Sequence, residues 1–113
     1  MTHRIFDMPV AEVYPHYVNK VRRKGRSEKE LHEVIRWLTG FNEEALKKQL
    51  ASGATIKQFF KEAKVNSKAK LITGSVCGVK VQEIEDPLMR KIRYLDKLVD
   101  ELAKGRPLEK VLR

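Results

Sequence analysis

Residues 86–105, DPLMRKIRYLDKLVDELAKG, decide the fold class, because they carry the start, the face and the end of a long helix. Asp86 suits the N-cap, Pro87 suits the first helical position, and Gly105 suits the end of the segment. Between these limits the apolar side chains recur at alternating steps of four and three residues, as Leu88, Ile92, Leu95, Val99 and Leu102. This spacing predicts one continuous apolar face, and hence a helix packed into a core.

Upstream, residues 9–23 predict another amphipathic helix, which Gly25 ends. Pro15 falls inside this segment, and proline lacks the N–H that a helix interior uses. We therefore expect the regular helix to begin near Val13, with Val10 packing from a preceding turn. Its apolar face consists of Val10, Val13, Tyr14, Tyr17 and Val21.

Two capping boxes mark further helices. Ser27 with Glu30, and Thr55 with Gln58, each pair an N-cap hydroxyl with a side chain three residues later. The first box predicts a helix over residues 28–38. The second predicts a short helix with Phe59, Phe60 and Ala63 in the core, ending at residues 65–67.

A helix over residues 43–51 is expected after the N-cap Asn42. Together with the preceding helix it has the outline of a helix-turn-helix motif. In that motif the first residues of the second helix approach DNA, and here they include Glu43 and Glu44, which would repel phosphates. Two helices that simply pack together explain the same residues better.

The stretch from 70 to 84 has no clear period. Gly74 and Gly78 disfavour a helix, while the pattern near its end alternates as a strand does. A short hairpin and an irregular buried loop both remain open. The overall prediction is a mainly α, compact multi-helix domain over residues 1–113, with one short β-hairpin near residues 70–82 as an option, and a final helical turn near the C-terminus.

Composition limits the class of protein. The chain has 113 residues, 42% of them hydrophobic and 35% charged, which suits a single globular domain. The lone Cys77 excludes an internal disulfide framework and fits a reducing compartment. No apolar run approaches the roughly 18 residues of a membrane-spanning helix, and the first residues lack the apolar centre of a signal peptide. We expect a cytoplasmic protein.

The positive charge is concentrated in the middle third. Residues 47–82 hold eight Lys and one acidic residue, Glu62, and so carry +7 of the formal net charge of +9. Charge of one sign attracts partners of the other. We therefore expect a non-enzymatic binding or interaction module whose partner is an acidic protein or a small anion. The residues proposed for this contact are Lys57, Lys61, Lys64, Lys68, Lys70, Thr73 and Ser75.

Nucleic-acid binding through the same surface is the alternative function. Three features weaken it: the segment has no Arg, its aromatic residues Phe59 and Phe60 look like core, and the overall charge is moderate. Residues 73–78 offer a second way to bind an anion, because glycines let successive N–H groups converge. A plain turn explains those glycines more simply.

Evidence for an enzyme is weak. Cys77 would need a neighbouring base to act as a nucleophile, and nothing places His3, His16 or His32 beside it. No residue set has metal-ligand spacing, so we predict no catalytic residue, cofactor or metal site. A ligand pocket beside the aromatic residues Trp37, Tyr14 and Tyr17 is an open option, although aromatic residues at helical spacing are usually core.

The apolar face of residues 86–105 has near-heptad spacing, so it offers two interpretations. It packs inside its own domain, which is the stronger default, or it pairs with a second copy of the chain. The homodimer interpretation would use Leu88, Ile92, Leu95, Val99 and Leu102.

Several stretches resemble one known family of small bacterial proteins, domain-of-unknown-function family 2200. They are THRIFDMP (2–9), VYPHYV (13–18), IRWLTG (35–40), ITGSVCGV (72–79) and IEDPLMRKIRYLDKLVDELAKG (84–105). The resemblance covers nearly the whole chain and implies a bacterial-type cytoplasmic protein. It implies no activity, ligand or catalytic residue.

Overall fold

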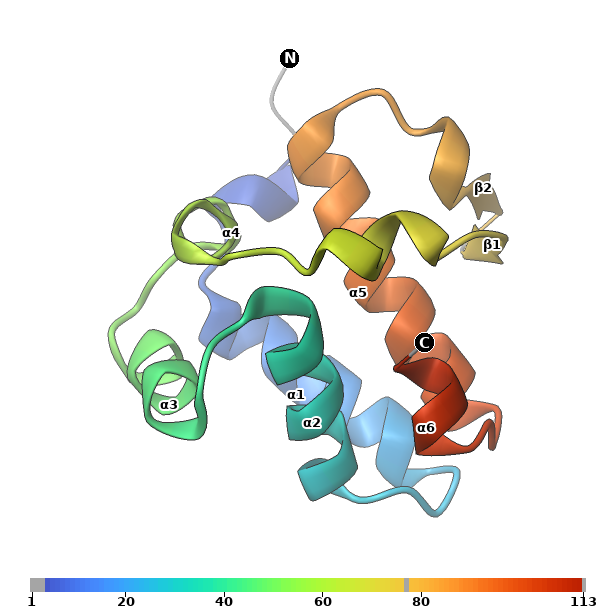
Figure 1. Cartoon of the computed structure of the whole chain (residues 1–113). Helices are drawn as coiled ribbons and strands as arrows, with labels where there is room; N and C mark the ends of the chain where they lie inside the picture. Colours follow the sequence, from blue (N-terminus) through green and yellow to red (C-terminus); the bar gives the residue numbers. More distant parts are fainter. Residues whose placement is uncertain (1–3, 77, 113) are drawn as a thin grey trace.

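The structure, a computed structural model, describes residues 4–76 and 78–112, and this part is mainly helical (Figure 1). Its α-helices are α1 (Val10–Arg22), α2 (Glu28–Thr39), α3 (Glu43–Ala51), α4 (Ile56–Glu62), α5 (Pro87–Ala103) and α6 (Leu108–Val111). Its short 3-10 helices are η1 (Arg4–Asp7), η2 (Ser67–Leu71) and η3 (Val81–Glu83). Strands β1 (Ser75–Val76) and β2 (Val79–Lys80) pair antiparallel, so the stretch that the sequence left open forms a hairpin. The predominance of helices confirms the mainly α prediction.

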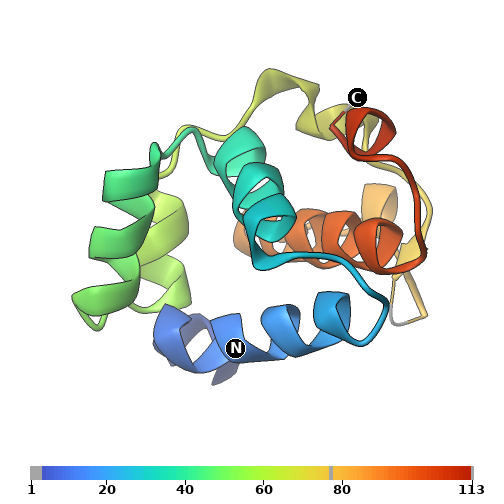
Figure 2. The ribbon, with the colours of Figure 1, turned by 90° about the horizontal axis from the view of Figure 1, so that it is seen from below.

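Helix α5 runs through the middle of the fold, and α1, α2, α4, α6 and the hairpin segment pack around it (Figures 1 and 2). Asp86 caps it as expected, because its carboxylate accepts the N–H groups of Leu88 and Met89 at 2.9 and 3.0 Å. The predicted face is buried, with Ile92, Leu95, Val99 and Leu102 all at most 4% exposed. The helix predicted from the longest apolar pattern, α5, therefore lies at the centre of the core.

Burial bears on the residues named for a homodimer. Ile92, Leu95, Val99 and Leu102 contact the chain's own core, and Leu88 packs at its edge. Four of the five side chains are therefore buried within the domain. The structure of one chain does not test self-association, so the homodimer stays a prediction.

Helix α1 begins at Val10, three residues earlier than expected. A tertiary contact fixes this start, because the Val10 N–H donates to the Ala54 carbonyl at 2.8 Å and Pro9 forms a bridge with Thr55. Pro15 consequently lies inside the helix, where the N–H it lacks would have bonded the carbonyl of Ala11. Both residues are exposed, so water can satisfy that carbonyl.

Both predicted capping boxes are present, and Asn42 caps α3 by accepting the Ala45 N–H at 2.7 Å. Helix α4, however, ends at Glu62 rather than at residues 65–67. The chain leaves the helix because it docks on the end of α2. There the N–H groups of Lys64 and Asn66 donate to the carbonyls of Thr39 and Leu38, at 2.8 and 2.9 Å.

Gly40 makes this docking possible. It ends α2 with a φ of 76°, a left-handed conformation that glycine adopts without a steric penalty. A Cβ at this position would lie 3.0 Å from the Lys64 carbonyl oxygen. The α2–α3 turn is therefore closed over the segment that follows α4.

The hairpin is held against α5. The Lys97 ammonium donates to the Ser75 carbonyl at 3.2 Å, and the Val81 N–H donates to the Gly74 carbonyl at 2.9 Å. Within residues 4–76 and 78–112, no helix is long and apolar enough to cross a membrane.

Candidate functional site

The predicted lysines follow one another along one stretch of the chain. From α4 this stretch crosses in front of α5 to the hairpin (Figure 1), and it bears Lys on α4, η2 and β2. All of these lysine side chains are exposed. We define the Lys strip as the predicted Lys57, Lys61, Lys64, Lys68 and Lys70 together with Lys80 on β2, which was not among the residues proposed from the sequence.

Lysines of the strip form no ion pair with the described residues. The cationic side chains that do pair with carboxylates in this part of the chain lie elsewhere, and they are Lys20, Arg26, His32, Arg36, Arg93, Lys104 and Arg106. Glu62, the single acidic residue of the segment, bonds to the amide of Gln49 instead. The charge concentration seen in the sequence thus remains uncompensated at the surface.

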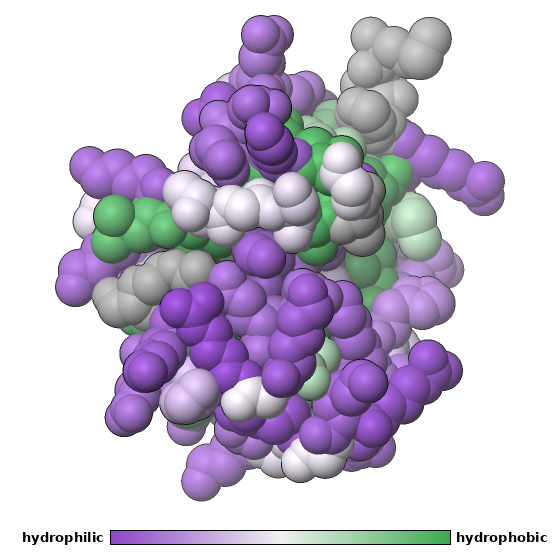
Figure 3. Space-filling model, turned by 90° about the vertical axis from the view of Figure 1, so that its right-hand side faces the viewer, coloured by the Kyte–Doolittle hydropathy of each residue, from purple (hydrophilic) through white to green (hydrophobic). Residues whose placement is uncertain are grey.

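Exposed apolar side chains lie beside the same lysines. Leu71 is 54% exposed and Val79 is 40% exposed, and these are the large hydrophobic residues most open to solvent in the described part of the protein. Leu71 follows Lys70, and Val79 precedes Lys80. On the side of the molecule that carries the hairpin, apolar surface lies in the upper half, while hydrophilic side chains cover most of the lower half (Figure 3).

Near α4 the strip borders a small hollow of about 230 Å³. Lys57, Lys61 and Lys91 surround it, and its apolar lining comes from Phe60, Pro87 and Leu88. Phe60 is only 1% exposed and Phe59 only 2%. The expectation that both rings belong to the core is confirmed, so neither presents a face on which a base could stack.

The glycine-containing loop is more occupied than its sequence suggested. Thr73 and Ser75 are exposed, but the Gly74 N–H already donates to the side-chain oxygen of Gln82 at 3.0 Å. That N–H is unavailable to an anion in this conformation. Anion contact through the two hydroxyls stays a prediction, and Cys77 and His3 lie outside the described residues, so the nucleophile hypothesis stays untested.

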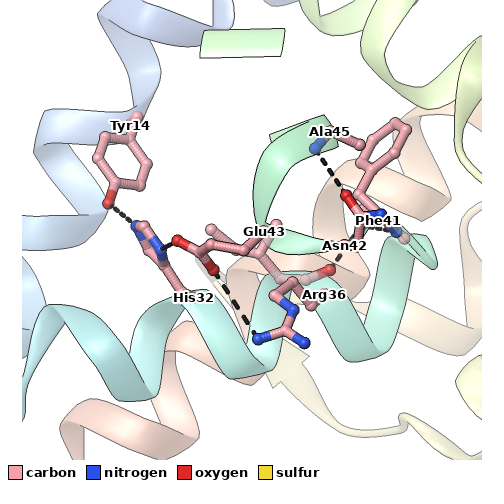
Figure 4. Close-up of polar contacts among 9 residues, drawn as sticks. Tyr14, His32, Arg36, Phe41, Asn42, Glu43 and Ala45 are labelled. Carbon is pink, nitrogen blue, oxygen red and sulfur yellow. Dashed lines mark hydrogen bonds and ion pairs between the residues drawn. The ribbon is translucent and has the colours of Figure 1, made fainter. Parts of the chain in front are cut away.

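A polar network that the sequence did not reveal joins the first three helices (Figure 4). The Tyr14 hydroxyl from α1 bonds to His32 Nε2 on α2, and His32 Nδ1 lies 2.7 Å from Glu43 Oε1 at the start of α3. Arg36 Nη1 lies 3.8 Å from the other oxygen of Glu43. No spacing along the chain marks this network, because each helix supplies a different member.

The electrostatics of the network favour a structural role. Burial raises the pKa of Tyr14 well above its ordinary value, and the negative charge of Glu28 adds to that rise. The hydrogen bond from His32 lowers the pKa of Glu43. Both ring nitrogens of His32 are bonded to protein, one to Tyr14 on α1 and the other to Glu43 on α3. The network therefore ties three helices together.

Two surface hollows meet at Arg36, and both are also lined by Glu33. One, of about 530 Å³, adds Trp37, Gly40, Phe41, Asn42 and Leu112. The other, of about 440 Å³, adds Glu28, Lys29, His32, Glu43 and Lys47. The pocket considered beside three aromatic residues does not form as a unit, because Tyr14 and Tyr17 line an interior void of only about 10 Å³. Among the described residues, no cluster of three or more ligating side chains suits a metal ion.

Comparison with known proteins places the chain in a family. Residues 4–113 match the family described as "Uncharacterized protein conserved in bacteria (DUF2200)". The chain is also similar to a solved structure titled "Crystal structure of uncharacterized protein SP1917", with 42% identity, 99% of this chain and 93% of that chain covered, and a TM-score of 0.92. No curated protein matches it. The chain belongs to the DUF2200 family, which confirms the resemblance noted in its sequence.

Proposed function

We propose that this member of the DUF2200 family is an interaction module that holds an acidic, partly apolar segment of another protein along the Lys strip. The observation that carries the proposal is the lack of internal compensation: the strip lysines are exposed and form no ion pair with described residues. Unpaired charges of one sign raise the local concentration of oppositely charged partners.

Charge alone would give weak and unselective binding. An exposed ion pair contributes about 0.2–1 kcal/mol and is screened by salt. Leu71 and Val79 add apolar surface beside Lys70 and Lys80, and burial of such surface contributes about 25 cal/mol per Å². A partner that alternates carboxylates with apolar side chains would use both kinds of contact.

The arrangement of the strip favours a long ligand over a compact one. The lysines follow the chain from α4 to the hairpin, across the width of the fold in Figure 1. A small anion would contact few of them at once, whereas an extended peptide would contact many. Thr73 and Ser75 lie along the same path and would add hydroxyl contacts.

Nucleic acid is the competing ligand for this surface. Residues 47–82 contain no Arg, and the two Phe side chains of this segment are buried. Base edges are read most often by Arg, and single strands are held by exposed aromatic rings. The surface therefore supports an acidic peptide better than an oligonucleotide.

Fluorescence anisotropy tests the proposal directly. The probes are a labelled peptide of repeating Glu-Glu-Leu, a matched peptide of repeating Glu-Glu-Ser, and a single-stranded oligonucleotide, each titrated from low to physiological salt. We expect the Leu-containing peptide to bind most tightly. Replacing Lys68, Lys70 and Lys80 by Gln should weaken its binding by about tenfold.

The matched control removes the same charge elsewhere, by changing Arg22, Arg23 and Lys24 to Gln. These side chains are exposed and lie outside the strip. Equal losses in both triple variants would reduce the effect to overall charge and overturn the proposal. Tighter binding of the oligonucleotide, with a steep salt dependence, would replace it with the nucleic-acid function.

A further inference from the structure

Arg36, in the last turn of α2, borders two surface hollows that are lined by no lysine of the Lys strip. We propose that Arg36 and the hollow walled by Trp37 form a binding site for a small organic monoanion, a carboxylate attached to an aromatic or apolar body. The site does not depend on the Lys strip, because neither hollow at Arg36 includes a strip residue.

Arg36 supplies the anion contact. Its Nη1 lies 3.8 Å from Glu43 Oε2, which is longer than a hydrogen bond, and the side chain is 44% exposed. The other oxygen of Glu43 is held by His32 at 2.7 Å. The guanidinium group therefore forms an ion pair with Glu43 but no hydrogen bond to it. Its N–H groups can donate to a ligand, and their fork matches the two oxygens of a carboxylate.

Neighbouring charges favour a single negative charge on the ligand. Lys29 and Lys47 line the hollow on one side of Arg36 and add positive potential. Glu33 lines both hollows, and Glu28 and Glu43 line the hollow that also contains Lys29 and Lys47. These carboxylates would repel a phosphate or any multiply charged group, so the balance selects a carboxylate over a polyanion.

The larger hollow supplies the apolar contact. Trp37, Phe41 and Leu112 line it, and each is partly buried against the core. The hollow has a volume of about 530 Å³ and is wide open to solvent, so a ligand would lie across it and would not be enclosed. Aromatic walls beside a guanidinium group suit a ligand with a flat apolar body and a carboxylate at one end.

The walls are fixed before any ligand arrives. Asn66 donates its side-chain N–H to the Trp37 carbonyl at 3.2 Å, and the Asn42 side chain is held by the Ala45 N–H at 2.7 Å. Gly40 closes the turn against Lys64. A ligand that enters a preformed site does not lose affinity to the ordering of a loop.

Trp37 makes the test simple, because it is the single Trp of the chain and reports directly on the hollow. We would titrate the intact protein with phenylacetate and follow Trp37 fluorescence. The neutral isostere phenylacetamide is the ligand control. For a ligand of this size we expect saturable binding with a Kd on the order of 1 mM, and at least about tenfold weaker binding of the amide.

Two variants examine Arg36. Arg36→Gln should weaken phenylacetate binding by about tenfold, and Arg36→Lys should restore only part of it, because an ammonium group lacks the fork. Arg22→Gln, which removes an exposed Arg outside both hollows, should leave binding unchanged. Far-UV circular dichroism and the shift of the Trp37 indole N–H resonance would confirm that each variant keeps its fold.

Equal responses to acid and amide, or full binding by Arg36→Gln, would overturn the site. Failure here is separable from failure of the Lys strip proposal. The variant with Lys68, Lys70 and Lys80 changed to Gln should bind phenylacetate normally, and Arg36→Gln should bind the Glu-Glu-Leu peptide normally.

Discussion

Charged side chains on α5 form ion pairs inside the protein, whereas the lysines of the Lys strip form none with the described residues. Along α5, Asp100 pairs with Lys20 and Lys104, and Arg93 pairs with Asp96. Along the strip, the lysines are exposed and form no ion pair with described residues. The difference teaches that a count of charges in a sequence does not reveal which are used inside the fold and which remain for a partner.

The largest contrast between the two regions should appear on truncating a leucine in each. Leu98→Ala removes a fully buried side chain of α5, and we expect it to lower the free energy of unfolding by about 2–5 kcal/mol. Leu71→Ala, next to Lys70 of the strip, should change it by less than about 0.5 kcal/mol. Urea unfolding measures both values, and equal losses would mean that the strip is part of the stabilising core.

The contact between Gly40, at the end of α2, and the strip residue Lys64 gives the next largest effect. Gly40→Ala forces a side chain into a left-handed conformation and places its Cβ 3.0 Å from the Lys64 carbonyl oxygen. We expect a loss of about 2–4 kcal/mol. Gly53→Ala is the control, because it has a similar φ of 75° with nothing within 4 Å of the new Cβ.

Gly53→Ala should lose only about 1–2 kcal/mol, the contribution of the backbone conformation alone. The difference between the two variants in thermal or urea unfolding measures the energetic contribution of the contact between residue 40 and Lys64. If both variants lose the same free energy of unfolding, the close approach of residue 40 to Lys64 contributes nothing to stability. The end of α2 and the segment after α4 would then be joined less firmly than the geometry indicates.

Removing an internal charge should have a smaller, pH-dependent effect. Burial raises the pKa of Asp100, but the bonds from Lys104 and Lys20 outweigh it, and the net pKa lies below its usual range. Because the folded pKa is lower than the unfolded value of about 3.9, these pairs stabilise the fold fully above that pH. Their contribution is lost as the pH falls through the folded pKa.

We therefore expect Asp100→Asn to lose about 0.5–1 kcal/mol at neutral pH and to match the parent protein in strong acid. Urea unfolding across that pH range provides the measurement. Glu109→Gln, an exposed acidic residue on α6, should show no such dependence. A loss for Asp100→Asn that persisted in strong acid would show that packing, and not charge pairing, holds this part of α5.

Removing positive charges from the Lys strip should have the smallest effect on the free energy of unfolding. Changing Lys68, Lys70 and Lys80 to Gln removes like charges that have no internal partner, so the free energy of unfolding should stay within about 0.5 kcal/mol of the parent value or rise slightly. The same variant should lose peptide binding. A clear loss of stability would show that these lysines serve the fold.

Local signals in the sequence were sufficient for most of the helices. The cap at Asp86, the capping boxes at Ser27 and Thr55, and the apolar face of α5 depend on residues within one or two turns of each other. Their geometry follows from helix periodicity, and the structure confirms all of them. Local rules also identified Phe59 and Phe60 as core residues.

Misplaced boundaries and the unforeseen network share a physical cause, which is contact between segments far apart in the chain. The start of α1 depends on Ala54, and the end of α4 depends on the carbonyls of α2. The larger hollow at Arg36 exists because the α2–α3 turn and Leu112, which follows α6, meet there. None of these contacts has a spacing that a sequence pattern can display.

The polar network of Tyr14, His32 and Glu43 has a consequence for sequence variation among related chains. Its three members sit on three helices, and each satisfies a polar atom of the next. A change of His32 alone to an apolar residue would leave the Tyr14 hydroxyl and the Glu43 carboxylate without their shared partner. We expect these positions to drift as a set, with tyrosine giving way to phenylalanine in chains where the histidine is lost.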